Sequence, residues 1–268
     1  MDLKLQGKRA LVTGSSSGIG AGIARMLAEE GCRVVVHGRD RERTNRVAME
    51  IGAAGAVIGD IATTSGADSV ASSAADAAGG AIEILVNNAG GGEGTTNLPW
   101  LDVPEDAWAR TFQTNTMGAV RLVHRLVPAM RGAGWGRIIQ ISSAVAARPT
   151  TRGPDYAGSK AALANITVSL AHALSGTGIT ANVVSPGVIL TPSVEKWTKD
   201  MSVSMGWGDV KRDELEGRLA VEMLKLPVAR IGNVEDIGIV VCMLASPRSG
   251  FITGANVRVD GGQVDSVN

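Results

Sequence analysis

Two side chains of this sequence have the types and the spacing needed for acid–base chemistry. The chain contains a single tyrosine, Tyr156, and Lys160 follows it by four residues. On a helix, residues i and i+4 share a face, so the phenol and the ammonium can serve one site. A phenol has a reference pKa of about 10, and a neighbouring positive charge favours its ionised form. The pair therefore predicts a site in which Tyr156 exchanges a proton with a bound substrate.

A serine thirteen residues before the tyrosine is a candidate for holding the substrate. Ser143 follows a short apolar run, residues 137–141, that is typical of a buried strand, so it lies at the carboxyl end of that strand. Its hydroxyl can hydrogen-bond a substrate oxygen and hold it for reaction. The ordinary alternative is a turn or capping serine, and Ser142 is a competing candidate.

A glycine-rich stretch near the N-terminus has the composition of a phosphate-binding loop. Residues 13–20, Thr-Gly-Ser-Ser-Ser-Gly-Ile-Gly, lie between an apolar strand and an amphipathic helix. Glycines let the chain turn sharply and approach a pyrophosphate, while the helix N-terminus supplies free N–H groups. Because turns collect glycine in any protein, it is the position between strand and helix that predicts a dinucleotide cofactor.

The end of the second expected strand indicates which dinucleotide is bound. NAD sites usually place Asp or Glu there, whereas this chain has Gly38 followed by Arg39 and Asp40. Without a carboxylate there is no repulsion toward a 2′-phosphate, and the Arg39 guanidinium can bind it. We therefore expect NADP(H) rather than NAD(H). Two alternatives stay open: Arg39 is a surface arginine with Asp40 as the N-cap of the next helix, or Asp40 folds back toward a ribose.

The elements that must position these residues alternate along the chain. Short apolar runs alternate with amphipathic ones, which predicts a parallel sheet covered by helices on both faces, with right-handed crossovers. The expected fold class is α/β, a single doubly wound Rossmann-type domain with a seven-stranded parallel sheet. The expected strands are residues 10–13, 33–37, 56–58, 82–86, 137–141, 179–184 and 256–259, and the expected helices are residues 19–30, 41–51, 64–78, 104–130, 155–175 and 234–244.

One domain, residues 1–268, is expected because no linker interrupts this pattern. The segment of about 191–227 is an exception, since it is long and follows a strand whose carboxyl end faces the expected ligand crevice. It contains Trp197 and Trp207. It is either a substrate-specificity loop or a pair of packing helices with ordinary core side chains, and the two interpretations are compatible.

The composition argues against several other classes of protein. Lys+Arg and Asp+Glu are balanced at 26 each, so no net charge attracts the protein to nucleic acid or anionic lipid. No apolar run approaches the ~18 residues of a membrane span, and Cys32 and Cys242 have no CxxC spacing. The three histidines lack the spacing of metal ligands, so no metal site is expected. We expect a soluble, cytoplasmic protein.

With these residues in this order, the sequence resembles the short-chain dehydrogenase/reductase family. The resemblance extends over the whole chain in ordered motifs: the 13–20 loop, Asp60-Ile61, Asn87-Asn88-Ala89-Gly90, Asn115, Ser143, Tyr156 with Lys160, Pro186-Gly187 and Asp260-Gly261-Gly262. The closing segment, residues 251–262, is similar to that of the family's bacterial 3-oxoacyl-carrier-protein reductases and related ketoreductases.

The resemblance implies a role for each matching position. Ser143 would orient the carbonyl and Tyr156 would exchange the proton. Lys160 would hold the nicotinamide ribose and favour the phenolate, and Asn115 would position a water that links Lys160 to solvent. The implied cofactor-binding residues are Gly14, Ser16, Ser17, Gly18, Ile19, Gly20, Arg39, Asp60, Ile61, Asn88, Ala89, Gly90, Tyr156, Lys160, Pro186, Gly187, Ile189 and Thr191. Many NADP-using relatives carry a basic residue where this chain has Ser17, so Arg39 would have to provide most of the 2′-phosphate recognition.

We therefore expect an oxidoreductase that transfers a hydride between NADP(H) and a small-molecule carbonyl or alcohol, a ketoreductase for which the 3-oxoacyl type is one option. The alternative enzyme is an NAD-dependent dehydrogenase of a steroid, sugar or xenobiotic alcohol. The alternative of another class is a regulator that senses NADP(H) without turnover. The resemblance also implies a homotetramer. The small side chains of Ala157, Gly158 and Ala161 permit close contact with a helix of another subunit, or equally packing of their own helix against its sheet.

Overall fold

The fold is built on one parallel sheet. The computed structural model describes residues 1–92, 94–207 and 210–266, and within these ranges seven strands pair in the order β3-β2-β1-β4-β5-β6-β7. The strands are β1 (Arg9–Val12), β2 (Arg33–Gly38), β3 (Gly55–Ile58), β4 (Ile84–Asn87), β5 (Gly136–Ile141), β6 (Ile179–Pro186) and β7 (Asn256–Val259). Each begins and ends within two residues of the expected range, so the predicted α/β class and the seven-stranded sheet are confirmed.

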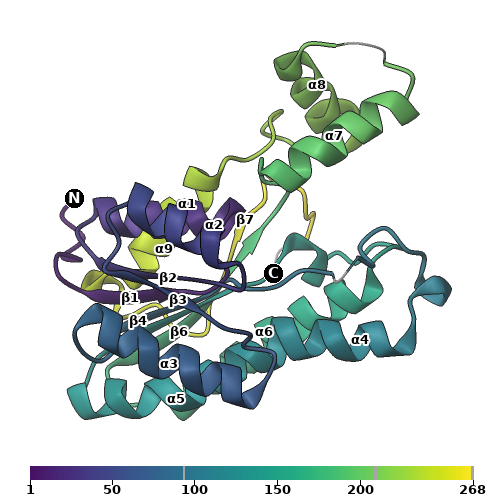
Figure 1. Cartoon of the computed structure of the whole chain (residues 1–268). Coiled ribbons are helices and arrows are strands. Elements are labelled where there is room, and N and C mark those ends of the chain that lie inside the picture. Colours follow the sequence, from purple (N-terminus) through teal and green to yellow (C-terminus); the bar gives the residue numbers. More distant parts are fainter. Residues whose placement is uncertain (93, 208–209, 267–268) are drawn as a thin grey trace.

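Helices cover both faces of this sheet (Figure 1). One layer consists of α1 (Gly18–Glu29), α2 (Arg41–Glu50) and α9 (Val234–Ala245), and the opposite layer of α3 (Thr64–Ala78), α5 (Gly118–Ala133) and α6 (Pro154–Ala173), with α4 (Glu105–Phe112) beside α6. Alternate residues of a buried strand supply the two cores, because successive side chains point to opposite faces. Thus Val12 packs in the α1–α9 core, whereas Leu11 packs in the α3–α5 core. The doubly wound arrangement is the predicted one.

The helix expected over residues 104–130 differs from the structure in its middle. It is divided into α4 and α5 by a π-helical turn, Gln113–Met117, in which the backbone N–H of Gly118 donates to the carbonyl of Gln113, five residues back. A Cβ atom at Gly118 would lie 3.0 Å from the Ile61 side chain, so the helix crosses the loop after β3 at close range here. Such turns are often found at functional sites, and this one contains Asn115.

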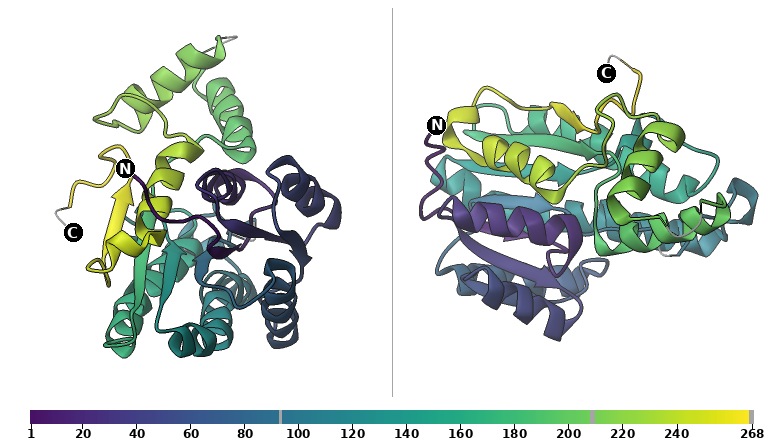
Figure 2. Two further views of the ribbon diagram at one scale, coloured as in Figure 1. Left: turned by 90° about the vertical axis from the view of Figure 1, so that its left-hand side faces the viewer. Right: turned by 90° about the horizontal axis from the view of Figure 1, so that it is seen from above.

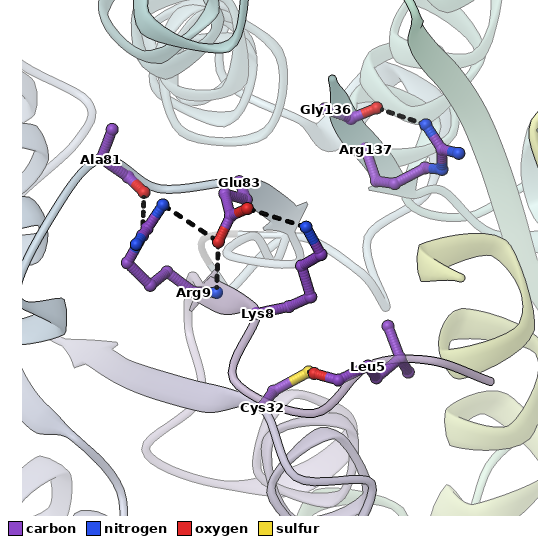
Figure 3. Close-up of polar contacts among 8 residues, drawn as sticks. All are labelled: Leu5, Lys8, Arg9, Cys32, Ala81, Glu83, Gly136 and Arg137. Carbon is purple, nitrogen blue, oxygen red and sulfur yellow. Dashed lines mark hydrogen bonds and ion pairs between the residues drawn. The ribbon is translucent and has the colours of Figure 1, made fainter. Parts of the chain in front are cut away.

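An ion-pair cluster fixes the edge of the sheet at which β1 and β4 begin (Figure 3). The Glu83 carboxylate accepts from Lys8 Nζ at 2.9 Å and from Arg9 at 3.1 Å, both through its guanidinium and through its backbone N–H. The Arg9 guanidinium also donates to the Ala81 carbonyl at 2.6 Å. These contacts hold β1 beside β4 at one end, so the residues that follow the two strands meet at the other.

The 191–227 segment forms helices that stand apart from the sheet (Figures 1 and 2). It contains α7 (Pro192–Ser204) and α8 (Arg212–Arg218), with residues 208–209 outside the described ranges. The two helices belong to a small apolar cluster of their own that includes Leu215 and Leu219. Trp197 and Trp207 pack against this cluster, so these tryptophans have the ordinary packing role that was one of the two interpretations.

Three further findings bear on the classes considered from composition. In the described ranges, no helix combines the length and apolar character needed to cross a membrane. Across those same ranges, no group of three His, Cys, Asp or Glu side chains gathers where a metal ion could be held. Cys32 and Cys242 are free and buried, and burial raises the pKa of each thiol to about 12. Neither is a reactive thiolate at neutral pH.

Candidate active site

The loops that follow β1 to β6 at the carboxyl edge of the sheet line two adjoining hollows. The tyrosine cleft, about 370 Å³, is lined by Ser143, Tyr156 and Lys160 together with the start of α1. The arginine cavity, about 560 Å³, is lined by Arg39, Asp60 and the residues around them. Both are bounded by Gly14, Ser17, Arg43 and Gly90. One elongated ligand can therefore extend from the first hollow into the second.

The side chains of Ser143, Tyr156 and Lys160 come together at the inner end of the cleft. Lys160 Nζ lies 5.8 Å from the centre of the Tyr156 ring. Burial raises the pKa of the Tyr156 phenol, and a hydrogen bond with the Ser143 side chain opposes that increase. Ser142, the competing serine, instead donates to the backbone carbonyl of Lys160 at 2.9 Å. Ser143 is thus the serine that faces the phenol, while Ser142 anchors the helix that carries it.

Lys160 is a buried cation, and little in its surroundings replaces the hydration that its ammonium has lost. Its side chain is 3% exposed, and its Nζ donates to the Ile141 carbonyl at 2.8 Å. Desolvation of the ammonium lowers the pKa of Lys160 from 10.5 to about 8. The ammonium is thereby held near the Tyr156 ring, and a positive charge close to a phenol in general favours the ionised form of the phenol.

Asn115 links the turn after β4 to the helix of Tyr156. Its amide oxygen accepts from the Gly91 N–H at 2.9 Å, and its amide nitrogen donates to the Gly91 carbonyl at 3.0 Å and to Ser159 Oγ at 2.8 Å. Gly90 separates it from the lysine, because a Cβ atom there would lie 2.7 Å from Asn115 Oδ1 and 3.1 Å from Lys160 Nζ. Only glycine leaves these two polar groups their positions, so Asn115 and Lys160 approach each other across Gly90.

The phosphate-loop candidate is braced by the turn after β4. Asn88 Nδ2 donates to the carbonyls of Thr13 and Gly14 at 2.9 and 3.1 Å. Thr13 Oγ1 accepts from the backbone N–H groups of Asn88 and Ala89, both at 3.0 Å. The next helix begins after Ser17, whose side chain makes no capping hydrogen bond. The first N–H groups of α1 are therefore available to an anion in the cleft, which fits a pyrophosphate.

Two arginines close to the end of β2, Arg39 and Arg43, line the arginine cavity. Asp40 is the N-cap of α2, and its carboxylate accepts from the Arg43 backbone N–H and from Arg43 Nε, each at 3.0 Å. These bonds hold the pKa of Asp40 below its usual value. Asp40 thus caps the helix and pairs with Arg43, and both Asp40 and the exposed Arg39 line the arginine cavity.

Steric contacts explain why glycine occupies position 38, where NAD sites usually have an acidic residue. A Cβ atom there would collide with Thr44 Oγ1 and lie 2.9 Å from Ser16 Cβ. The backbone of β2 therefore passes too close to the phosphate loop and to α2 for any side chain, and the floor of the arginine cavity has no carboxylate at this position.

Arg43 is a residue that sequence reasoning missed. It borders both hollows, one turn into α2, and its partner Asp40 leaves part of the guanidinium exposed. Its position three residues after the N-cap, in the helix that begins beside the phosphate loop, is a signal that could have identified it.

The other expected residues, apart from Ile189, line one of the two hollows. Ser16, Ala89 and Ile61 line the arginine cavity, and Ile19, Gly20, Pro186, Gly187 and Thr191 line the tyrosine cleft. Ile189 lies apart: its side chain is 4% exposed, packs in the α1–α9 core and borders a separate cavity of about 500 Å³. Its side chain is not among those that the cleft brings together.

The comparison with protein families decides what this arrangement belongs to. The sequence model described as short chain dehydrogenase matches residues 8–202, which include the phosphate loop, Ser143, Tyr156 and Lys160. The chain belongs to the short-chain dehydrogenase/reductase family. It is accordingly an oxidoreductase of the kind that interconverts alcohol and carbonyl groups, and it uses a nicotinamide cofactor as this family does.

Relatives of this dehydrogenase act on different substrates. A 3-oxoacyl-[acyl-carrier-protein] reductase of Staphylococcus aureus is 34% identical over 95% of this chain and 97% of its own length. The structure of L-sorbose reductase from Gluconobacter frateurii, complexed with NADPH and L-sorbose, has a TM-score of 0.90 at 33% identity, with both chains fully covered. A 7α-hydroxysteroid dehydrogenase complexed with NADH has a TM-score of 0.84 at 30% identity, covering 100% of this chain and 98% of its own.

The burial of Lys160 in this dehydrogenase predicts a cost in stability. Lys160→Met keeps the length and bulk of the side chain and removes the buried charge. We expect it to raise the free energy of unfolding at pH 7 by about 1–2 kcal/mol, net of the lost bond to the Ile141 carbonyl. Because the folded-state pKa is the lower one, the cost is fully present below pH 8 and disappears between about 8 and 10.5.

Urea unfolding at pH 7 and at pH 10 measures this effect. The difference between Lys160→Met and the parent should shrink at the higher pH. Lys196, an exposed lysine of α7, provides the control, since Lys196→Met should leave stability unchanged at both pH values. A Lys160→Met protein that is less stable than the parent at pH 7 would contradict the prediction.

Proposed function

We propose that this protein is an NADP(H)-dependent ketoreductase in which Tyr156 is the proton donor. The observation that carries the proposal is the cleft itself, where Ser143, Tyr156 and Lys160 line one hollow with the open N-terminus of α1. The arginine cavity is lined by Arg39 and Arg43 together with Asp40 and Asp60, and the cleft offers the free backbone N–H groups of α1. Guanidinium groups and free N–H groups suit a dinucleotide with an extra phosphate. When bound, the nicotinamide supplies or accepts the hydride.

The residues of this chain hold the substrate and transfer the proton. The Ser143 hydroxyl holds the carbonyl oxygen of the substrate, and the Tyr156 hydroxyl transfers its proton to that oxygen as charge develops there. The Lys160 ammonium stabilises the resulting phenolate. In the direction of alcohol oxidation the same phenolate removes the proton. Asn115, held by Gly91 and Ser159, positions a water through which the proton is restored from solvent.

Two classes of substrate are candidates for this cleft. A ketone of the 3-oxoacyl type is one candidate, favoured by the similarity of the closing segment and by the relative from Staphylococcus aureus. A small polyhydroxy ketone is the second candidate, favoured by the likeness over full length to L-sorbose reductase. A panel of both substrate types, assayed at 340 nm with NADPH and with NADH, distinguishes them. No turnover with any of them would favour the sensor alternative.

The first test concerns Tyr156. Tyr156→Phe keeps the packing of the ring and deletes the transferable proton, so we expect kcat to fall at least about 1,000-fold while NADPH binding stays within about twofold. Activity is measured by NADPH oxidation and binding by the quenching of tryptophan fluorescence. Because Tyr156 is the single tyrosine, phenolate absorbance also reports its titration directly. A variant with near-normal kcat would overturn the assignment.

The second test concerns the choice of cofactor. Arg39→Ala removes an exposed guanidinium from the arginine cavity, so KM for NADPH should rise about tenfold while KM for NADH changes little. Arg41→Ala is the matched control, since Arg41 is also exposed on the first turn of α2 but does not line the cavity. Introducing an acid at Gly38 is unsuitable because no Cβ atom fits there. A parent protein that already prefers NADH in kcat/KM would show that the interpretation is mistaken.

The third test concerns assembly into a homotetramer, which the family resemblance implies. Apolar side chains are exposed on α9 and just before β7, with Ile239 60% exposed and Phe251 fully exposed. On α6, Val168 is 44% exposed beside small residues that allow another helix to approach. We expect light scattering at micromolar concentration to give about four times the chain mass of 27.5 kDa. A mass near that of one chain, with full activity, would remove the proposal.

A further inference from the structure

One buried side chain at the floor of the arginine cavity has no role in the chemistry described above. His37 lies in β2, is 2% exposed, and borders the cavity that Arg39 and Asp60 also line. Its imidazole makes two hydrogen bonds, each to the backbone of a different loop. The Gly14 N–H donates to Nδ1 at 3.1 Å, and Nε2 lies 3.2 Å from the Gly59 carbonyl oxygen.

These two partners determine the state of the ring. A backbone N–H can only donate, so Nδ1 carries no proton, and a backbone carbonyl can only accept, so Nε2 carries the proton. The imidazole is therefore neutral, in the Nε2–H form. Burial lowers the pKa of His37 to about 4, while nearby Asp60 raises it and Arg39 lowers it to smaller extents. The ring keeps both bonds throughout the physiological range of pH.

The two loops joined by this ring bound the cavity from different sides. Gly14 is the first glycine of the phosphate loop, and Gly59 directly precedes Asp60 at the end of β3. The backbone of His37 strengthens the connection to the first loop: its carbonyl accepts from the Ser15 N–H at 2.8 Å, and its N–H donates to Ser15 Oγ at 3.0 Å. A change in the ring would therefore alter the spacing between the loops after β1 and β3.

We propose that His37 is a positioning residue for the adenosine end of the cofactor, setting the distance between the phosphate loop and the loop after β3. The proposal rests on the assignment of this hollow to a dinucleotide. The proposal does not depend on the chemistry at Tyr156, which lies in the tyrosine cleft. Loss of the imidazole should weaken binding of the adenosine moiety and leave the rate at saturating cofactor almost unchanged, a separation that general destabilisation would not produce.

The experiment compares three variants of the full chain by calorimetric titration with 2′,5′-ADP and with ADP, two probes that carry no nicotinamide. His37→Leu removes both ring bonds and leaves the Gly14 N–H unpartnered, and we expect Kd for the preferred probe to rise about tenfold. His37→Asn can place its amide oxygen near the position of Nδ1, so it should recover most of that loss. His124→Leu, at an exposed position on α5, is the control and should bind as the parent does.

Steady-state assays complete the test. KM for the cofactor should rise in His37→Leu in proportion to Kd, with kcat within about twofold of the parent. Unchanged Kd for both probes, or a loss confined to kcat, would overturn the proposal. If His37→Leu does not fold, His37→Gln replaces it. The glutamine amide reaches toward Gly59 but leaves the Gly14 N–H without an acceptor. Affinity like that of the parent in this variant would also overturn the proposal. Since neither probe can be reduced, a protein that reduces no ketone still gives a clear answer.

Discussion

The hydrogen bonds between Asn88 and the phosphate loop are the contacts on which the rest of the site depends. Where β1 ends, the Asn88 amide nitrogen donates to the carbonyls of both Thr13 and Gly14. Buried backbone groups without partners are costly, so this turn and this loop are stable only together. Their joint position leaves the start of α1 open, and it brings Gly90 against Asn115 and Lys160. The cofactor side and the reacting side thus share one anchor.

The charge at the site follows from the same packing. Lys160 is enclosed between β5, the turn after β4 and the π-helical turn of Asn115, so its ammonium has lost most of its hydration. The ammonium stays at this position because α6 is held in place. Ser142 donates to the backbone carbonyl of Lys160, and Thr116 donates to that of Ser159. A fixed cation in a region of low polarity stabilises a developing anion more than a mobile one in water does.

Much of this arrangement could be predicted from the sequence, because the signals are local. The period of apolar residues located the strands, and the spacing of Tyr156 and Lys160 placed both on one face of a helix. What could not be predicted depends on segments that are distant in sequence. The Gly14 N–H meets the ring of His37 twenty-three residues away, and Gly38 is excluded from carrying a side chain by Thr44 and Ser16. The π-helical turn at Asn115 likewise depends on how the chain crosses Ile61.

The helices of the 191–227 segment have a consequence for how such proteins diversify. Their apolar cluster is separate from the two cores that pack on the sheet, and Val188, Leu190 and Ile231, from either side of the segment, also belong to it. The segment joins the rest of the chain through Thr191, which lines the tyrosine cleft, and through the residues that lead into α9. Since this cluster shares no residue with the two cores on the sheet, mutations inside it can change the segment without disturbing the strands. The packing of this segment and the packing of the sheet are thereby separately mutable, so a lineage can change one while inheriting the other intact.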